Sequence, residues 1–378
     1  MEFDEKLLKK IKNKIEFDKT KSELLIEFIS KMGKVGDDLK KHLNTIMKNS
    51  YRIKNEIKNK FNLYRVDKNY NLNLKSKEIV AIDGSSNIGG QLSGKFVCLY
   101  SVARIHILID QLDNIFPSEY YWGDLEIIDA LDEIKIKELL EIKMIQKETE
   151  AYYDSIQLFD SSSKNHKIIF VDGPVIDPPA YKEEKFVNSR CNIIKNLISN
   201  DIILIGCVKR IFSSDFCNYI VNLISNDDLK NKIKLYLNDS YLISSLMADY
   251  RKQNNFHGVI ITDFYNNLIY EKTASYQYYM HDVEVRSLFF QYSTKHNLIR
   301  VDIPFIKSEE IDLNNIYEIV KTNLIEWSYP GIDLPYPVYL AHDFSKIRNG
   351  CAQKIYDDII SKNLSNKPIG QLLVNMLK

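Results

Sequence analysis

Two aspartates that end apolar segments are the first candidates for chemistry in this sequence. Asp83 ends the run 78–83 and Asp172 ends the run 167–172, and a glycine follows each of them. An open α/β sheet usually places its ligand crevice at the ends of its strands, so we expect the two carboxylates to meet there. The glycine lets the chain turn away and leaves room for a ligand or an ion. Asp-Gly is also among the commonest turn signals, so a plain turn at each position is the alternative.

Carboxylates that are brought together repel one another. A divalent cation removes that repulsion while it supplies a Lewis acid and an activated water. Oxygen ligands suit Mg²⁺ or Mn²⁺ better than zinc. A phosphodiester hydrolase that uses two metal ions needs such a cluster together with one more acidic residue, and often a histidine. The two aspartates therefore make a metal-dependent hydrolase one candidate class for this chain.

Strands and helices are expected to alternate around these aspartates, which predicts an α/β fold. Apolar runs of strand length predict strands at 78–83, 95–103, 167–172, 202–210, 259–262, 288–292 and 298–304. Helical spacing predicts two or three amphipathic helices between residues 5 and 62, and further helices at 134–159, at 185–199 and from about 345.

The connections between these elements carry turn signals. Gly84-Ser85-Ser86 is expected to halt the first strand, Gly89-Gly90 to form the turn after it, and the aromatic stretch 120–122 to be irregular. The helix at 185–199 lies between two predicted strands, which favours a β-α-β crossover. The run 202–210 is an uninterrupted pattern typical of a buried strand, whose sheet is covered on both faces.

Composition narrows the class of protein. Apolar residues make up 45% and charged residues 27%, which is ordinary for a globular chain. Lys plus Arg and Asp plus Glu both total 51, so the net charge of zero does not point to a polyanionic partner. Basic runs near the start are typical of a solvated helix face, with contact to nucleic acid as the alternative. The five cysteines are scattered, which predicts reduced thiols. Without a signal peptide or an apolar run of roughly 18 residues, we expect a cytoplasmic protein with no membrane partner.

Five segments resemble the successive motifs of the NurA nuclease family, and they stand in the order of that family. They extend over roughly residues 78–350. The segments are Ala81-Ile82-Asp83-Gly84-Ser85, Leu140-Glu141, Phe170-Val171-Asp172-Gly173-Pro174, Ile205-Gly206-Cys207-Val208-Lys209-Arg210 and Pro335-Tyr336-Pro337-Val338-Tyr339-Leu340-Ala341-His342.

The resemblance implies a ribonuclease H-like α/β fold, in which helices flank a mixed sheet. An N-terminal helical region at 1–75 would precede a NurA-type nuclease domain at 76–378. The resemblance also implies a metal-binding group that holds Mn²⁺ or Mg²⁺, as two ions. Its members would be Asp83, Glu141, Asp172 and His342, with Tyr336 as a further catalytic residue.

The same resemblance implies what the protein acts on and works with. The expected activity is exonuclease or endonuclease cleavage of DNA ends, with a HerA-type hexameric ATPase as partner and a homodimer as the assembly. The chain contains no Walker-type phosphate loop, so a motor would have to come from a separate protein. Repair by DNA end resection and antiviral defence are both open as biological roles.

Several residue assignments keep alternatives. Glu148 and Glu150 compete with Glu141 for the third acidic position, because all three lie in one predicted helix. Lys209 and Arg210 follow a buried strand and suit the DNA backbone, but an ordinary charged strand end would look the same.

Aromatic residues offer a further possible contact with DNA. The tyrosines 276, 278 and 279 could stack on exposed bases, although packing is their commoner use.

Two other functions fit parts of the pattern. A non-catalytic DNA-end clamp or scaffold would have the same fold without turnover, and the loss of an acidic ligand would favour it. An actin-like or sugar-kinase-like phosphotransferase also uses strand-end aspartates around phosphates. Its first loop normally separates aspartate from glycine by one residue, whereas Asp83 and Gly84 are adjacent here, which counts against it.

Overall fold

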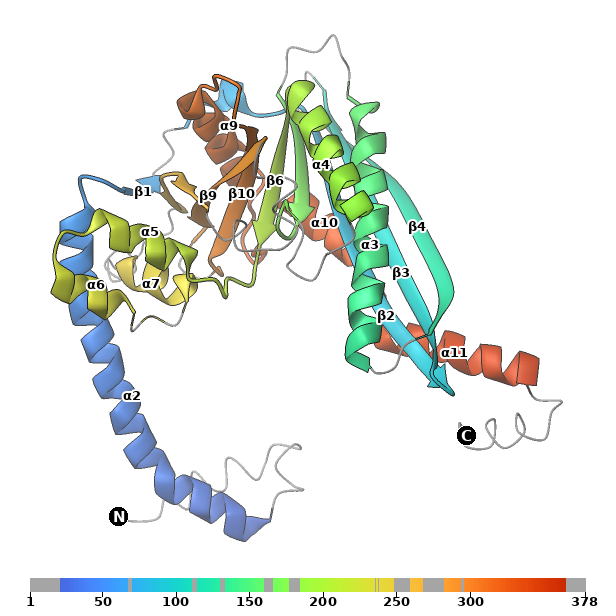
Figure 1. Cartoon of the computed structure of the whole chain (residues 1–378), viewed down its shortest axis with the longest axis horizontal. Helices are drawn as coiled ribbons and strands as arrows, with labels where there is room; N and C mark the ends of the chain where they lie inside the picture. Colours follow the sequence, from blue (N-terminus) through green and yellow to red (C-terminus); the bar gives the residue numbers. More distant parts are fainter. Residues whose placement is uncertain are drawn as a thin grey trace.

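A long mixed β-sheet runs through the molecule and carries both aspartates (Figure 1). The computed structural model describes residues 21–66, 70–110, 114–129, 133–159, 166–176, 184–234, 236, 238–247, 259–267, 282–293 and 296–364. Within these ranges no helix combines the length and the hydropathy that a bilayer crossing requires.

Strands and helices alternate through much of the chain. The strands are β1 (Leu63–Val66), β2 (Glu78–Leu92), β3 (Lys95–Ile109), β4 (Ile115–Asp129), β5 (Lys167–Asp172), β6 (Ile202–Val208), β7 (Val259–Thr262), β8 (Tyr265–Asn266), β9 (Val283–Gln291) and β10 (Ile299–Ile306). The helices are α2 (Ser22–Ile57), the 3-10 turn η2 (Leu72–Leu74), α3 (Glu133–Ile156), α4 (Glu184–Ser199), α5 (Asp215–Leu223), α6 (Asp227–Ile233), α7 (Asp239–Leu246), α9 (Leu313–Glu326), α10 (Tyr336–Ser345) and α11 (Asn349–Leu364).

The sheet is mixed, as the sequence predicts. Its order is β1-β7-β9-β10-β6-β5-β2-β3-β4, with β8 paired to β9. The long strands β2, β3 and β4 form an antiparallel meander. Strand β5 runs parallel to β2, and β6 runs parallel to β5 after the predicted crossover through α4. The meander followed by parallel strands is a ribonuclease H-like arrangement, which confirms the predicted fold class.

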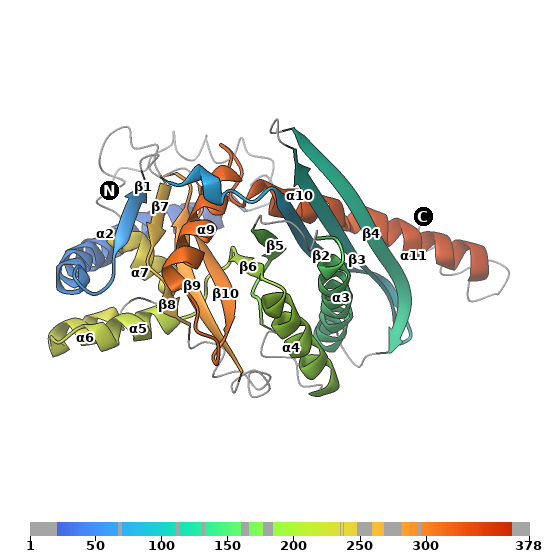
Figure 2. The ribbon, with the colours of Figure 1, turned by 90° about the horizontal axis from the view of Figure 1, so that it is seen from above.

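Helices cover both faces of this sheet (Figure 2). Side chains alternate along β2, so Ile79 and Ala81 join the core with α9 and α10, whereas Val80 and Ile82 join the core with α3 and α4. Figure 2 shows α3 and α4 side by side on one face of the central strands. The continuous apolar runs of β2, β5 and β6 follow from this two-sided burial.

The expected end of the first strand is wrong. Strand β2 continues through Gly84 to Leu92, because residues 84–92 pair with β3, and the chain reverses at Ser93 and Gly94, whose φ angles are 51° and 78°. The expected turn at 89–90 lies instead inside β2 at a bulge.

Glycines 89 and 90 serve helix packing. A Cβ at Gly89 would lie 2.7 Å from the carbonyl oxygen of Ala352, and one at Gly90 would lie 2.6 Å from the Tyr356 ring. Both partners belong to α11, so these glycines let α11 cross close over β2.

Three further expectations change with the structure. The stretch 120–122 is regular strand, because β4 pairs with β3 along its whole length and its aromatic residues suit a sheet surface. Residues 22–57 form the single helix α2, while residues 1–20 lie outside the described part. The last segment holds two helices rather than one: α11 confirms the helix expected from about 345, and α10 before it begins at Tyr336, where proline is tolerated in the first helical turn.

A helical lobe made of α5, α6, α7 and the second half of α2 packs against the β7–β9 end of the sheet (Figure 1). A buried ion pair on β10 faces this lobe. Arg300 donates to both carboxylate oxygens of Asp302, at 2.8 and 2.9 Å, and its third bond, of 3.2 Å, reaches Ser213. Ser213 in turn donates to the buried Asp239 at 2.6 Å. The pair therefore ties the sheet to the segment that follows β6.

Replacing Arg300 with methionine should destabilise the fold by about 3–5 kcal/mol, because it leaves the charge of Asp302 buried without its main counter-charge. The matched control is Lys95→Met, which breaks an exposed ion pair with Asp129 at the β3–β4 hairpin and should cost less than about 1 kcal/mol. Urea unfolding of the two variants measures the difference. Equal losses of stability would contradict this role of the buried pair.

Candidate active site

Neighbouring parallel strands bring Asp83 and Asp172 together. Ile82 pairs with Val171 in the β2–β5 register, and each aspartate is the next residue of its strand. Because side chains alternate, Asp83 lies on the face of Ile79 and Ala81, which is the α10 face, and Asp172 follows the same rule on β5. The side chains are 7% and 8% exposed. Both carboxylates are thus held nearly out of water on one face.

Helix α10 closes over the two carboxylates. His342 Nδ1 lies 3.0 Å from Oδ2 of Asp83 and 3.1 Å from Oδ2 of Asp172. One turn later, Ser345 Oγ donates to Oδ2 of Asp83 at 2.8 Å, and the carbonyl of Ser345 accepts from the hydroxyl of Ser101 on β3. The buried residues Val338 and Ala341 seat α10 on the sheet, and the spacing of His342 and Ser345 follows from the helical repeat.

Strand β6 adds a positive charge to this group. Cys207 pairs with Asp172 in the β5–β6 register, and Lys209 stands two residues later on the same face. The Lys209 ammonium lies 2.6 Å from Oδ2 of Asp172. Arg210 is exposed at the next position, past the end of β6.

Helix α3 brings a third acidic side chain, Glu148, to the opposite side of β2. Its carboxylate accepts a hydrogen bond from the backbone N–H of Gly84. A Cβ on Gly84 would lie 2.6 Å from Oε1 of Glu148 and 2.7 Å from Cγ of Met144, so the missing side chain of Gly84 is what allows this approach. Burial, reinforced by the negative charges of Asp83 and Asp172, raises the pKa of Glu148 to about 8.

The same electrostatics act on the rest of the cluster. Burial and the charge of Asp83 raise the pKa of Asp172, against the opposing effect of Lys209. The hydrogen bond to Asp83 raises the pKa of His342. The carboxylates thus repel one another, and the imidazole and the ammonium partly balance their charge.

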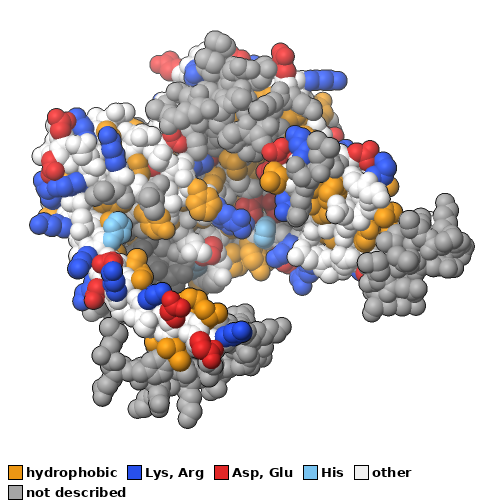
Figure 3. Space-filling model, turned by 60° about the horizontal axis from the view of Figure 1, so that its bottom comes forward, with side chains coloured by type: hydrophobic (Ala, Val, Ile, Leu, Met, Phe, Trp, Pro, Cys, Tyr) orange, Lys and Arg blue, Asp and Glu red, His pale blue; other side chains and the backbone are white. Residues whose placement is uncertain are grey.

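These donors fit a divalent cation. One atom each of Asp83, Asp172 and His342 can be chosen so that all three lie within 4.8 Å of one another. The two carboxylates suit Mn²⁺ or Mg²⁺, and the imidazole favours Mn²⁺ of the two, because Mg²⁺ prefers oxygen ligands. Figure 3 views the end of the molecule toward which β5 and β6 run, and it shows a hollow where acidic, basic and histidine side chains gather.

The other predicted site residues lie apart from this cluster. Glu141 is exposed on α3, two turns before Glu148, and lines a cavity with β2 and α11. Glu150 is exposed and pairs with Lys147 at 2.9 Å. Tyr336 begins α10 and contacts the rings of Tyr329 and Tyr339.

The sequence analysis did not identify two residues of the site, Ser345 and Gly84. Ser345 had a signal, because it follows His342 by three positions in a helix, but no motif named it. The role of Gly84 as an opening for Glu148 depends on the position of α3, which the sequence does not give. The tyrosines 276, 278 and 279 lie outside the described residues.

Comparison with known proteins shows which family this chain resembles. The model of the NurA domain matches residues 77–347. The crystal structure of the NurA nuclease from Sulfolobus solfataricus superposes with a TM-score of 0.50 and 17% identity, covering 89% of this chain and 98% of that chain, which shows a shared fold. No curated protein matches the sequence.

Two endonuclease V structures also align, with lower scores. The Bacillus subtilis protein has a TM-score of 0.32 and 11% identity, covering 82% of this chain and 92% of that chain. The human catalytic domain has a TM-score of 0.31 and 11% identity, covering 80% of this chain and 94% of that chain.

Replacing Gly84 with alanine should weaken Mn²⁺ binding about tenfold, because the added Cβ pushes the carboxylate of Glu148 away from the cluster at a cost of roughly 1.4 kcal/mol in affinity. The fold should survive, since the contacted atoms belong to flexible side chains. Gly123→Ala on β4 is the matched control, because no atom lies within 4 Å of the Cβ it adds. Titration calorimetry measures both affinities, and an unchanged affinity in Gly84→Ala would show that Glu148 takes no part.

Proposed function

The chain belongs to the NurA family, and on that premise we propose that it is a metal-dependent deoxyribonuclease that hydrolyses phosphodiester bonds at DNA ends. Membership of the family supports nuclease activity in general. The observation that carries the more specific proposal is the cluster of Asp83, Asp172 and His342, whose ligand atoms meet on one face of the sheet.

We assign the metal ligands on this cluster. Asp83, Asp172 and His342 would hold Mn²⁺ or Mg²⁺. We propose that two ions bind at this cluster. Glu148, rather than Glu141, would be the third acidic ligand, because its carboxylate lies against Gly84, the residue next to Asp83, whereas Glu141 is exposed two turns earlier on α3. A bound divalent cation supplies a Lewis acid and lowers the pKa of the attacking water.

The chain's own residues would then orient the metal ligands and the substrate. Ser345 holds Oδ2 of Asp83, and so fixes which oxygen of that carboxylate faces the site. Nδ1 of His342 lies beside both carboxylates and would be the metal-binding atom, so Nε2–H would donate a hydrogen bond to a phosphate or leaving oxygen. The ammonium of Lys209 would turn from Asp172 to a phosphate once a cation has neutralised that carboxylate, and Arg210 would contact the DNA backbone.

The proposed partners follow from family membership and from what the chain lacks. Because the sequence contains no Walker-type phosphate loop, a motor that delivers DNA would have to be a separate protein. A HerA-type hexameric ATPase would supply this, and a homodimer would present two sites to the DNA.

Asp83→Asn and Asp172→Asn should each lower cleavage of end-labelled linear DNA in Mn²⁺ at least about 100-fold, because each removes a charged ligand that contributes several kcal/mol to the stabilisation of the transition state. EDTA should abolish cleavage by the wild-type chain. Neither variant should unfold the protein, since each relieves repulsion within the cluster.

Asp129→Asn is the control for these variants, because Asp129 is an exposed carboxylate at the β3–β4 hairpin, and it should cleave like the wild type. Cleavage that persists in EDTA, or full activity in both site variants, would contradict the proposed function.

A further inference from the structure

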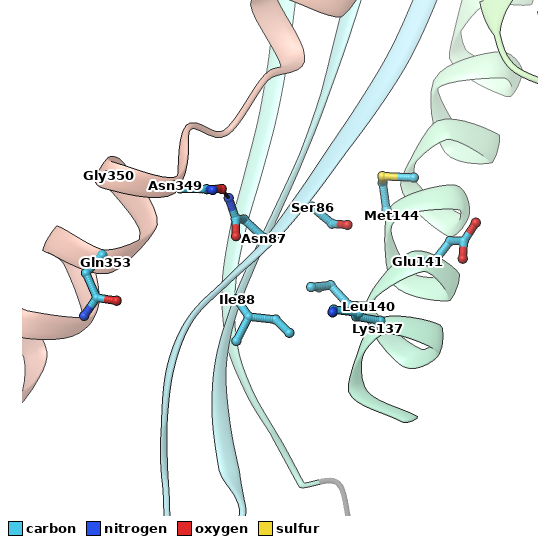
Figure 4. A pocket seen from close by; sticks show the side chains of 10 residues that line it. All are labelled: Ser86, Asn87, Ile88, Lys137, Leu140, Glu141, Met144, Asn349, Gly350 and Gln353. Carbon is cyan, nitrogen blue, oxygen red and sulfur yellow. Dashed lines mark hydrogen bonds between the residues drawn. The ribbon is translucent and has the colours of Figure 1, made fainter. Parts of the chain in front are cut away.

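A cavity of about 750 Å³ opens between β2, α3 and α11 (Figure 4). Its walls are segment 86–88 of β2, segment 137–144 of α3 and segment 349–353 of α11. The volume is in the range of cavities that hold small ligands. The nuclease site described above does not use this space.

Two of the cavity's walls, β2 and α3, also carry residues of the acidic cluster. On β2, Ser86 stands three residues beyond Asp83, or about 10 Å at the rise of a strand. On α3, Glu141 and Lys137 lie on the face of Glu148 and are about 10 and 16 Å from it along the helix axis. The elements that hold the cluster thus also form the cavity.

The lining offers the groups that recognise nucleotides. The amides of Asn87 and Asn349 are joined by a hydrogen bond of 2.7 Å, and Gln353 stands one turn further along α11. Such amides both donate to and accept from base edges. Figure 4 shows Lys137 and Leu140 reaching from α3 toward β2, so an ammonium for phosphate and an apolar surface for a base or sugar face these amides.

We propose that this cavity is a subsite for nucleotides of a single DNA strand next to the bond that is cleaved. The proposal rests on the nuclease function given above. A stacked strand rises roughly 3.4 Å per nucleotide, so the distance from Asp83 to Ser86 corresponds to about three nucleotides. A single strand is favoured over a duplex, because its unpaired bases can turn their edges to the amides. Glu141 then serves as an acceptor for base amino groups instead of a metal ligand.

Binding of a short, fluorescein-labelled single-stranded oligonucleotide to the full-length chain tests the subsite. Fluorescence anisotropy in EDTA separates binding from cleavage. The double variant Lys137→Glu with Gln353→Ala should bind about tenfold more weakly than the wild type. Lys135→Glu is the matched control, because Lys135 is an exposed lysine of the same helix outside the cavity, and it should bind within about twofold of the wild type.

The outcomes separate the two proposals. Three results would overturn the subsite. The wild type and the double variant could bind the single strand equally well, or the wild type could fail to bind it. The Lys135→Glu variant could also lose as much affinity as the double variant. An unlabelled duplex of equal length should compete less well than the single strand, and equal competition would overturn the strand preference. The wild type could bind the single strand more tightly than the double variant and yet fail to cleave DNA in Mn²⁺. That result would support the subsite and contradict the proposed nuclease function.

Discussion

Repulsion between carboxylates that have little contact with water is the constraint that the rest of the site must satisfy. Asp83 and Asp172 lie side by side because β2 and β5 are parallel and in register, and Glu148 reaches the same region over Gly84. Burial raises the pKa of Asp172 and of Glu148, and the negative charge of Asp83 raises both further. The imidazole of His342 and the ammonium of Lys209 balance part of the charge, and a divalent cation would balance the rest.

Much of the surrounding structure can be understood as support for this arrangement. Two apolar layers fix the central strands from both faces, and so set the direction of each aspartate. Helix α10 supplies His342 and Ser345 from one side, while α3 supplies Glu148 from the other. The buried Arg300–Asp302 pair ties β10 to the segment after β6, which begins with Lys209. The cluster therefore depends on elements that are far apart in the sequence.

The sequence predicted the strands of the central sheet, the crossover through α4 and both aspartates, because long apolar runs and strand-end glycines are local signals. The sequence-based predictions were wrong or incomplete where contacts between distant segments determine the structure. Glycines 84, 89 and 90 look like turn residues, yet they lie within β2, which pairs with β3 there, and their missing side chains leave room for Glu148 and α11. The choice between Glu141 and Glu148 could not be made from spacing alone, because both lie on one face of α3 and only the position of that helix on β2 distinguishes them.

The identity of the third acidic ligand tests the account most directly. Glu148→Gln and Glu141→Gln make the same change on the same helix, two turns apart, and their cleavage of end-labelled DNA in saturating Mn²⁺ can be compared. The account predicts that Glu148→Gln loses at least about 100-fold in rate, whereas Glu141→Gln stays within about threefold of the wild type at saturating DNA. Full activity in Glu148→Gln together with a large loss in Glu141→Gln would contradict it.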